Sequence, residues 1–222
     1  MEGSTDKRIV IAGAGEFGRM AHLYLTREGF NVVGFTAEKE FITDHTWQGL
    51  SVYPVEELEL VASLTDTIII MAITSVNRCI SKERVFHTIA SKGFLMGTYT
   101  HPKSFIDPTA SIGAGCFIFE HNTIQANVII ENNVTLWSGN HVGHNSRIGA
   151  HSFLSSHVAL CGGIQVGQRC FFGVNASIAP YLTIGKDCAI GMGTAVFRDV
   201  PDGMIIKRGD SRDEMEKARI NI

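Results

Sequence analysis

The chain has 222 residues, 45% of them apolar, which is enough for one large domain or two modest domains with packed cores. Its 19 Lys and Arg against 22 Asp and Glu give a formal net charge of −3, which disfavours nucleic acid and anionic membranes as partners. No apolar run approaches the roughly 18 residues of a membrane span, and the polar start does not resemble a signal peptide, so we expect a cytoplasmic protein.

The first hundred residues alternate between segments with strand and helix patterns. This alternation predicts a small parallel α/β domain over residues 1–100, with four or five strands. In chain order we expect a strand within 7–15, a helix over 16–28, a strand over 31–36, a short strand and a short helix within 47–61, a strand over 67–73, and a helix over 76–93 that Gly93 ends.

A different rule begins near residue 101, where an apolar residue recurs at every sixth position through sixteen consecutive hexads. A hexapeptide is too short for a helical repeat or a hairpin, but it can form one flat side of a triangular coil. We therefore predict an α/β domain followed by a β-solenoid over 101–200 and a tail over 201–222. The hexad positions are Ile106, Ile112, Ile118, Ile124, Ile130, Leu136, Val142, Ile148, Leu154, Leu160, Val166, Phe172, Ile178, Ile184, Ile190 and Val196.

Three hexads make an 18-residue turn, so each short strand should pair with the strands 18 residues before and after it. The glycines at 113, 143, 149, 167, 173, 185 and 191 are expected at corners whose φ values are costly for other residues.

The five cysteines lack a CxxC pair, which argues against a disulfide framework and a thiolate zinc site. We expect them to be small buried hydrophobic residues, and we predict no metal site. They are Cys79, Cys116, Cys161, Cys170 and Cys188.

Several stretches carry a family resemblance: IGAGCFI, VGQRCFFGVNASI and IGKDCAIGMGTAV in the repeat, IVIAGAGEFGR before it and FRDVPDGMII after it. Together they resemble the sugar N-acyltransferases of bacterial surface-glycan synthesis, the group that includes PglD and NeuD. The resemblance implies a left-handed parallel β-helix of hexapeptide repeats behind a Rossmann-like nucleotide-sugar-binding domain. It also implies a homotrimer that acylates an amino sugar on a nucleotide with an acyl-CoA, with active sites between neighbouring β-helices.

Transfer of an acyl group from a thioester to an amine needs a base, and histidine is the natural base near neutral pH. The family's base motif corresponds to HNSRIG, residues 144–149, which makes His144 the matching position. Asn145 stands where the family has an acid that orients the imidazole, so the orienting group must come from elsewhere. His141 is the second candidate for the base.

One coil after His144 lies Gly162, whose backbone N–H could support the developing oxyanion. Alternatively, Gly162 and Gly163 only turn a corner. Phe153 occupies the position at which relatives often carry a second histidine near the acyl group, so that imidazole is absent or replaced by His151 or His157.

Some β-helices of this kind bind zinc through three histidines and hydrate carbon dioxide. His121 and His157 lie two coils apart, as two such ligands would, but the third position is Gly162. A zinc carbonic anhydrase is therefore disfavoured.

The stretch GAGEFG, residues 13–18, fits a glycine-rich loop between a strand and a helix. By resemblance, Gly13, Gly15, Gly18 and Arg19 would hold the diphosphate of the sugar nucleotide, with Thr36 at the end of the second strand. No acid stands there to bind the ribose of NAD, which weakens a dinucleotide site, and the glycines could serve only for close packing.

These observations predict an acyl-CoA-dependent N-acyltransferase, with acetyl-CoA as the expected co-substrate and no tightly bound cofactor. The nearest rival is a sugar O-acetyltransferase on the same fold. The sequence also leaves open a non-catalytic, nucleotide-binding trimeric scaffold and an NAD enzyme.

Overall fold

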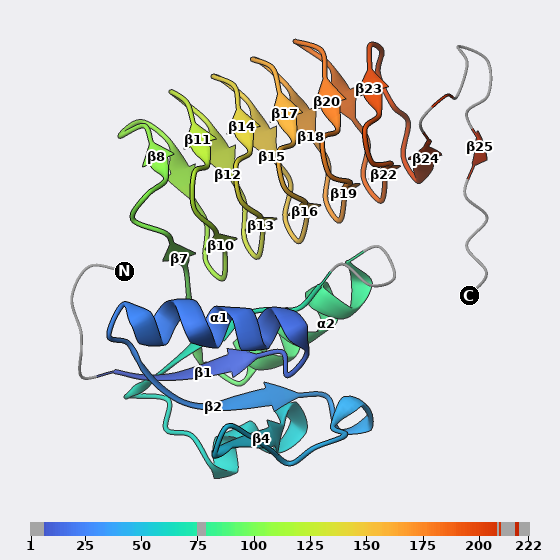
Figure 1. The fold of residues 1–222 in the computed structure, drawn as a ribbon. Coiled ribbons are helices and arrows are strands. Elements are labelled where there is room, and N and C mark those ends of the chain that lie inside the picture. Colours follow the sequence, from blue (N-terminus) through green and yellow to red (C-terminus); the bar gives the residue numbers. More distant parts are fainter. Residues whose placement is uncertain (1–6, 75–78, 208, 210–215, 218–222) are drawn as a thin grey trace.

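The N-terminal domain of the computed structural model is a twisted sheet with helices on both faces (Figure 1). The structure describes residues 7–74, 79–207, 209 and 216–217. The strands are β1 (Arg8–Ala12), β2 (Asn31–Ala37), β3 (Thr46–Trp47), β4 (Leu50–Pro54), β5 (Thr67–Met71) and β6 (Leu95–Gly97), in the order β3-β4-β2-β1-β5-β6. The helices are α1 (Glu16–Arg27) and α2 (Ile80–Ser91), with short 3₁₀ helices at η1 (Lys39–Phe41) and η2 (Val55–Leu60).

Five of these strands are parallel, and β3 adds an antiparallel edge by pairing with β4. The predicted helix over 76–93 is α2, although residues 75–78 lie outside the described part of the chain. One face of the sheet packs on α1, and the other packs on α2 and η2.

The second domain is a left-handed parallel β-helix, as expected. Its first sheet, here the domain-facing sheet, contains β7 (Tyr99–Thr100), β10 (Phe117–Ile118), β13 (Thr135–Leu136), β16 (Phe153–Leu154), β19 (Phe171–Phe172), β22 (Ala189–Ile190) and β24 (Met204–Ile206). The second sheet contains β8 (Phe105–Ile106), β11 (Thr123–Ile124), β14 (His141–Val142), β17 (Ala159–Leu160), β20 (Ser177–Ile178) and β23 (Ala195–Val196). The third sheet contains β9 (Ser111–Ile112), β12 (Ile129–Ile130), β15 (Arg147–Ile148), β18 (Gln165–Val166) and β21 (Thr183–Ile184).

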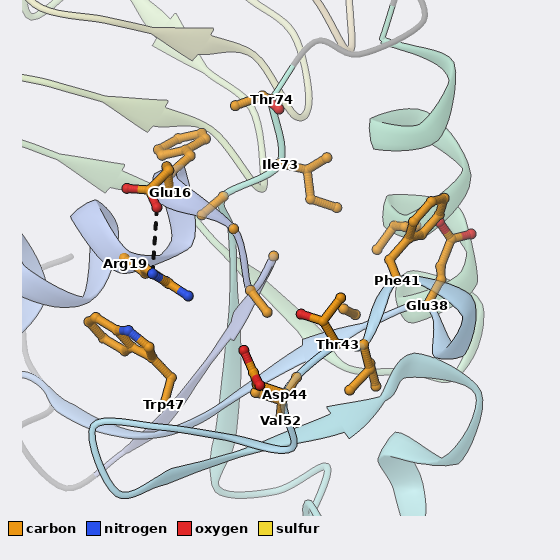
Figure 2. Close-up of a pocket in the computed structure, with 18 of the residues that line it drawn as sticks. Glu16, Arg19, Glu38, Phe41, Thr43, Asp44, Trp47, Val52, Ile73 and Thr74 are labelled. Carbon is orange, nitrogen blue, oxygen red and sulfur yellow. Dashed lines mark ion pairs between the residues drawn. The ribbon is translucent and has the colours of Figure 1, made fainter.

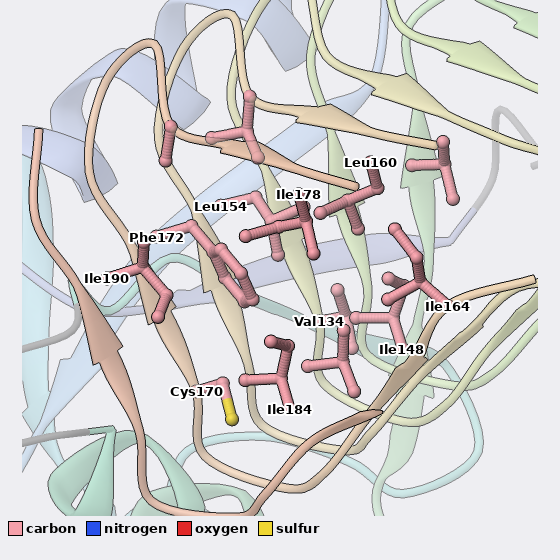
Figure 3. Close-up of a cluster of buried hydrophobic side chains, with 14 of the residues drawn as sticks. Val134, Ile148, Leu154, Leu160, Ile164, Cys170, Phe172, Ile178, Ile184 and Ile190 are labelled. Atoms are coloured by element: carbon pink, nitrogen blue, oxygen red, sulfur yellow. The ribbon is translucent and has the colours of Figure 1, made fainter. Parts of the chain in front are cut away.

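The predicted register of 18 residues is confirmed throughout the β-helix. Val142, for example, pairs with Ile124 on one side and with Leu160 on the other. The hexad side chains point into the prism and form one continuous core, of which Figure 3 shows a part. From Ile118 to Val196 every hexad residue is buried, so burial of the aliphatic stripe drives each coil to close.

The corners of the prism follow a second rule, which corrects the expectation about glycine. The left-handed φ values fall on every sixth residue from Gly115 to Gly193, and most of these positions hold Asn, His or another side chain. The glycines at 113, 143, 149, 167, 173, 185 and 191 have no positive φ. They are needed because the backbone of the next coil passes too close for a Cβ at six of them and is tight against Gly191.

The two domains are joined by aromatic packing between α1 and the domain-facing sheet (Figure 1). The Phe17 ring lies 5.2 Å from Phe117 and 5.5 Å from Trp137, and Trp137 stacks on Phe119 at 4.5 Å. Burying one such ring contributes roughly 1.5–3 kcal/mol, so this contact fixes which face of the prism the N-terminal domain covers.

The ends of the β-helix differ slightly from the predicted boundaries. It begins at Tyr99, because β7 already pairs with β10. Residues 204–206 form β24 and extend the domain-facing sheet, and β25 (Glu216–Lys217) pairs with β24 in antiparallel fashion. Among the described residues, no helix is long and apolar enough to span a membrane.

Four of the five cysteines are buried, as expected. The expectation is wrong for Cys161, which is exposed. It directly follows the strand β17, where the side chain is not one of the inward hexad positions.

The close approach of adjacent coils predicts that Gly149→Ala destabilises the protein. The new Cβ would lie 2.5 Å from the carbonyl oxygen of Gly167, and overpacking of this kind costs about 2 kcal/mol. Thermal unfolding at fixed protein concentration should show a melting temperature lower by about 5 °C. Gly15→Ala is the control, because its Cβ meets no atom within 4 Å and should change stability by less than about 0.5 kcal/mol. Equal melting temperatures for the two variants would contradict the steric explanation.

Candidate functional sites

A cavity of about 470 Å³ opens at the carboxyl ends of β1, β2 and β5 (Figure 2). In parallel α/β sheets this edge is the usual place for a ligand. Gly13, Gly15 and Arg19 line the cavity, as the sequence predicts.

The rim of this cavity offers groups that suit an anion. Helix α1 begins after Gly15 without a side-chain cap, so its first backbone N–H groups have no side-chain partner. The Arg19 guanidinium lies 5.5 Å from the centre of the Trp47 ring, and only a 3.5 Å contact links it to the exposed Glu16. Its Nε atom is buried without a hydrogen bond.

Gly18 and Thr36 do not line the cavity. A Cβ at Gly18 would overlap the carbonyl oxygen of Gly13, so this glycine serves the close packing of α1 against the loop. Thr36 is fully buried, and its hydroxyl donates to the Tyr53 carbonyl at 2.9 Å. Its predicted contact with a nucleotide is therefore corrected to a role inside the sheet.

Two carboxylates at the cavity differ in their partners. Glu38 accepts two hydrogen bonds from Arg84, at 2.6 and 2.9 Å, and is thus already neutralised. Asp44 is exposed and, among the described residues, has no hydrogen-bond or ion-pair partner. It points toward the cavity in Figure 2. Asp44 was not singled out from the sequence, because it lies outside the glycine-loop motif.

His144 stands at the corner between the second and third sheets, exposed to solvent. Its backbone is anchored from both sides: its N–H donates to Gln125 Oε1 at 2.9 Å, and its carbonyl accepts from the Gly163 N–H at 2.8 Å. The imidazole therefore projects from a rigid part of the backbone.

Asn145 contacts the imidazole directly, with 3.1 Å between its Nδ2 atom and His144 Nδ1. One coil earlier, Asn127 Nδ2 donates to Asn145 Oδ1 at 3.1 Å. Both asparagines have left-handed φ values, 58° and 56°, which Asn tolerates better than most residues. The stacked corners thus build a chain of two amides that ends on His144.

Gly162 lies beneath the imidazole, as the spacing of 18 residues predicts. A Cβ there would come within 2.6 Å of His144 Nε2, so the ring can occupy this place only over glycine. Within the described part of the chain, the Gly162 N–H donates to no backbone acceptor, whereas Gly163 has φ +74° and turns the corner.

The other predicted residues do not all join this corner. His141 belongs to the strand β14 and pairs with Ala159, so it lies on a flat side and not at a corner. Phe153 is only 6% exposed and stacks 5.9 Å from Phe171 in the domain interface, which corrects its expected contact with acyl-CoA. His151 and His157 stand at the other two corners of the same coil.

The cavity and His144 lie on different sides of the chain. The N-terminal domain packs on the domain-facing sheet, whereas His144 stands at the opposite corner, between the second and third sheets (Figure 1). A ligand in the cavity is therefore remote from the imidazole of its own chain.

Glu83, His87 and His151 form a third cluster, which sequence analysis missed because it joins α2 to the β-helix. Their ligand atoms all lie within 4.8 Å of one another, so they could hold a metal ion. Burial lowers the pKa of His151 to about 4, although the Glu83 carboxylate opposes that shift. The i, i+4 spacing of Glu83 and His87 on a helix was the available signal.

Comparison with known proteins places this geometry in context. Residues 163–198 match the family model for the hexapeptide repeat of succinyl-transferase. A perosamine N-acetyltransferase from Caulobacter crescentus, solved with CoA and GDP-perosamine, superimposes with a TM-score of 0.80 at 26% identity, over 94% of this chain and 96% of that one. The chain is a hexapeptide-repeat protein of the left-handed β-helix fold, built like the sugar N-acetyltransferases.

The same two-domain fold occurs in the acetyltransferase domain of PglB from Neisseria gonorrhoeae, with a TM-score of 0.81 at 23% identity over 90% of this chain and 96% of that one. Among curated proteins, an acyl-[acyl-carrier-protein]–UDP-N-acetylglucosamine O-acyltransferase from Sinorhizobium fredii is 32% identical over 46% of this chain. The chain covers only 41% of that relative's length.

The lowered pKa of His151 predicts a loss of stability in acid. The unfolded chain binds a proton near the ordinary pKa of 6.5, whereas the folded chain does so only near 4. The contribution is complete above pH 6.5 and is lost as pH falls toward 4, which amounts to about 2 kcal/mol at pH 5. In EDTA-containing buffer, His151→Asn should therefore lose less unfolding free energy between pH 7.5 and 5 than the wild type. Asn suits the left-handed φ of 65° at this position.

Urea unfolding at the two pH values measures this difference. His45→Asn is the control, because His45 is exposed and should leave the pH dependence unchanged. An equal loss in His151→Asn and wild type would contradict the assignment.

Proposed function

We propose that this protein is an acyl-CoA-dependent N-acyltransferase, with acetyl-CoA as donor, acting on an amino sugar linked to a nucleotide. The observation that carries the proposal is the match over nearly the whole of both chains to a sugar N-acetyltransferase solved with CoA and a nucleotide sugar. The exposed His144 over Gly162 supplies the base and the amide that the reaction needs.

In this mechanism His144 Nε2 removes a proton from the sugar amine as the nitrogen attacks the thioester carbonyl. The Gly162 N–H, which has no backbone acceptor within the described residues, hydrogen-bonds to the developing oxyanion. Collapse of the tetrahedral intermediate expels the CoA thiolate, and the proton held by His144 neutralises it. The products are the amide and CoA.

Asn145 is the orienting group in place of the family's acid. A base that accepts a proton at Nε2 must carry its own proton on Nδ1. Rotation of the Asn145 and Asn127 amides by 180° exchanges oxygen and nitrogen and presents Asn145 Oδ1 to that Nδ1–H. The chain of two amides survives this rotation, because Asn127 then accepts from Asn145. Unlike a carboxylate, the amide adds no charge beside the imidazolium.

The cavity of the N-terminal domain is the proposed nucleotide site. The diphosphate would lie against Gly13, Gly15 and the first turn of α1, with Arg19 as a counter-charge. The unpartnered Asp44 is suited to accept hydrogen bonds from the N–H groups of guanine, which is the base carried by the sugar nucleotide in the Caulobacter enzyme. The binding of Glu38 by Arg84 and the burial of Thr36 disfavour the NAD alternative.

A homotrimer would bring the two sites together. His144 is remote from the cavity of its own chain, so the acceptor must reach it from a neighbouring copy. Exposed apolar side chains on the β-helix, among them Phe105, Ile129 and Tyr181, would be covered by such contacts. Both substrates are made in the cytoplasm, where we place the reaction.

A sugar O-acyltransferase is the second candidate, because several of the curated relatives transfer acyl groups to a hydroxyl from an acyl-carrier protein. Their match spans less than half of this chain, whereas the N-acetyltransferase match spans both domains. The bond formed in the product distinguishes the two activities, since mild alkali cleaves an ester and leaves an amide.

His144→Ala should lower kcat by about 100-fold or more, because it removes the base. The assay supplies acetyl-CoA with GDP-, UDP- and dTDP-linked amino sugars, follows release of the CoA thiol, and identifies the product by mass spectrometry before and after mild alkali. His141→Ala is the matched control and should stay within a few-fold of wild type. Near wild-type turnover of His144→Ala would refute this assignment of the base. Failure to bind acetyl-CoA at millimolar concentration would favour a non-catalytic scaffold.

Asn145→Asp should move the acidic limb of the kcat/KM profile to higher pH by about one unit. The new carboxylate would stabilise the imidazolium, so deprotonation of the base needs a higher pH. Asn175→Asp is the control, because Asn175 holds the same left-handed conformation at another corner. Identical profiles for wild type and Asn145→Asp would show that Asn145 does not act on the base.

A further inference from the structure

The cluster at the junction of α2 and the β-helix resembles a metal site more than a set of ion pairs. Glu83 and His87 lie one turn apart on α2, and His151 faces them from a corner of the β-helix. The rings of His87 and His151 are 5.2 Å apart, and His151 Nε2 lies 3.8 Å from Glu83 Oε1. This last distance is too long for a hydrogen bond, so Nε2 has no direct acceptor there.

The donors stand on elements whose separation is fixed. The side chain of His151 is only 5% exposed, and its backbone belongs to the ladder of the coils. On α2 the fully buried Lys82 donates to Thr135 Oγ1 at 2.8 Å and to the Ser152 carbonyl at 3.2 Å. These bonds hold α2 against the prism, so the three donors keep their spacing without a bound ion.

We propose that Glu83, His87 and His151 bind one divalent transition-metal ion, with zinc as the best fit, between the two domains. Two imidazoles and a carboxylate are a common zinc donor set, and three protein ligands leave one position for water. His87 is exposed, which gives the ion a path of entry. The proposal is independent of the acyltransferase activity.

Asn133 provides a second observation that points to a ligand. It is fully buried, and its Oδ1 atom has no hydrogen-bond partner, while its Nδ2 atom lies 2.9 Å from His151 Nδ1. A metal on Nε2 requires a proton on Nδ1, and metal-bound histidines usually donate that N–H to an oxygen. Rotation of the Asn133 amide would give Oδ1 this partner. The Lys82 carbonyl, which Nδ2 now contacts at 3.1 Å, lies within α2 and keeps its helical hydrogen bond.

The charges that face the cluster set its affinity. Arg169 Nη1 donates to Glu83 Oε1 at 3.0 Å, and the same guanidinium holds Asp187 at 2.6 and 2.9 Å. Lys82 is the second nearby cation. A metal ion would therefore compete with Arg169 for Glu83, and Arg169 would remain paired with Asp187. Removal of Arg169 should tighten metal binding.

Calorimetric titration of the EDTA-treated, tag-free, full-length protein with Zn²⁺ tests the proposal. We expect one site per chain, and His87→Ala should weaken it at least about 10-fold. His87 is exposed on α2, so this variant should fold normally. His45→Ala, at an exposed histidine outside the cluster, is the matched control and should bind as the wild type does. No binding at millimolar Zn²⁺, or equal affinity in His87→Ala and wild type, would overturn the proposal.

Arg169→Gln and Co²⁺ provide the second measurement. Arg169→Gln should bind Zn²⁺ several-fold more tightly than the wild type, and bound Co²⁺ should give the visible absorption of a four-coordinate site. An unchanged or weaker affinity would mean that Glu83 is not a ligand and would overturn the three-donor assignment. Neither readout depends on acyl transfer, so its failure is distinguishable from failure of the proposed function.

Discussion

The backbone ladder between successive coils is the interaction on which the rest of this structure depends. Each strand of the β-helix pairs in parallel with the strand 18 residues away, so any residue has fixed neighbours one coil before and one coil after it. The ladder places Gly162 under His144 and Asn145 under Asn127. It also explains the glycines beside the hexad positions, because coils held at this spacing leave no room for a Cβ.

The second constraint is the aromatic contact that seats α1 on the domain-facing sheet. A triangular prism has three faces, and covering one of them leaves the opposite corner open to solvent. His144 stands at that open corner, whereas the cavity at the glycine loop lies with the covered face. The same contact brings α2 beside another corner, where it meets His151. One packing choice thus separates the two proposed substrate sites and creates the third cluster.

The corners show how one conformational rule can serve several purposes. The left-handed position recurs every six residues, and its occupants differ in chemistry: Asn145 contacts the His144 ring, His151 faces α2, and Arg169 joins Glu83 to Asp187. Asn145 is thus suited twice to its position, by its tolerance of this conformation and by its amide. An acid is less suited to this φ than asparagine, although Asp187 shows that one can be placed there.

The sequence by itself determined the β-helix, its register and the stacking of His144 over Gly162, because a strict period of six leaves one way to bury the aliphatic stripe. It also determined the alternating α/β domain and the glycine loop that lines the cavity. Only the tertiary structure decided that Phe153 and Thr36 are buried, that Glu38 is bound by Arg84, and that Glu83 and His87 meet His151. The physical reason is range: periodicity fixes neighbours within the ladder, whereas contacts between the domains depend on which face of the prism α1 covers.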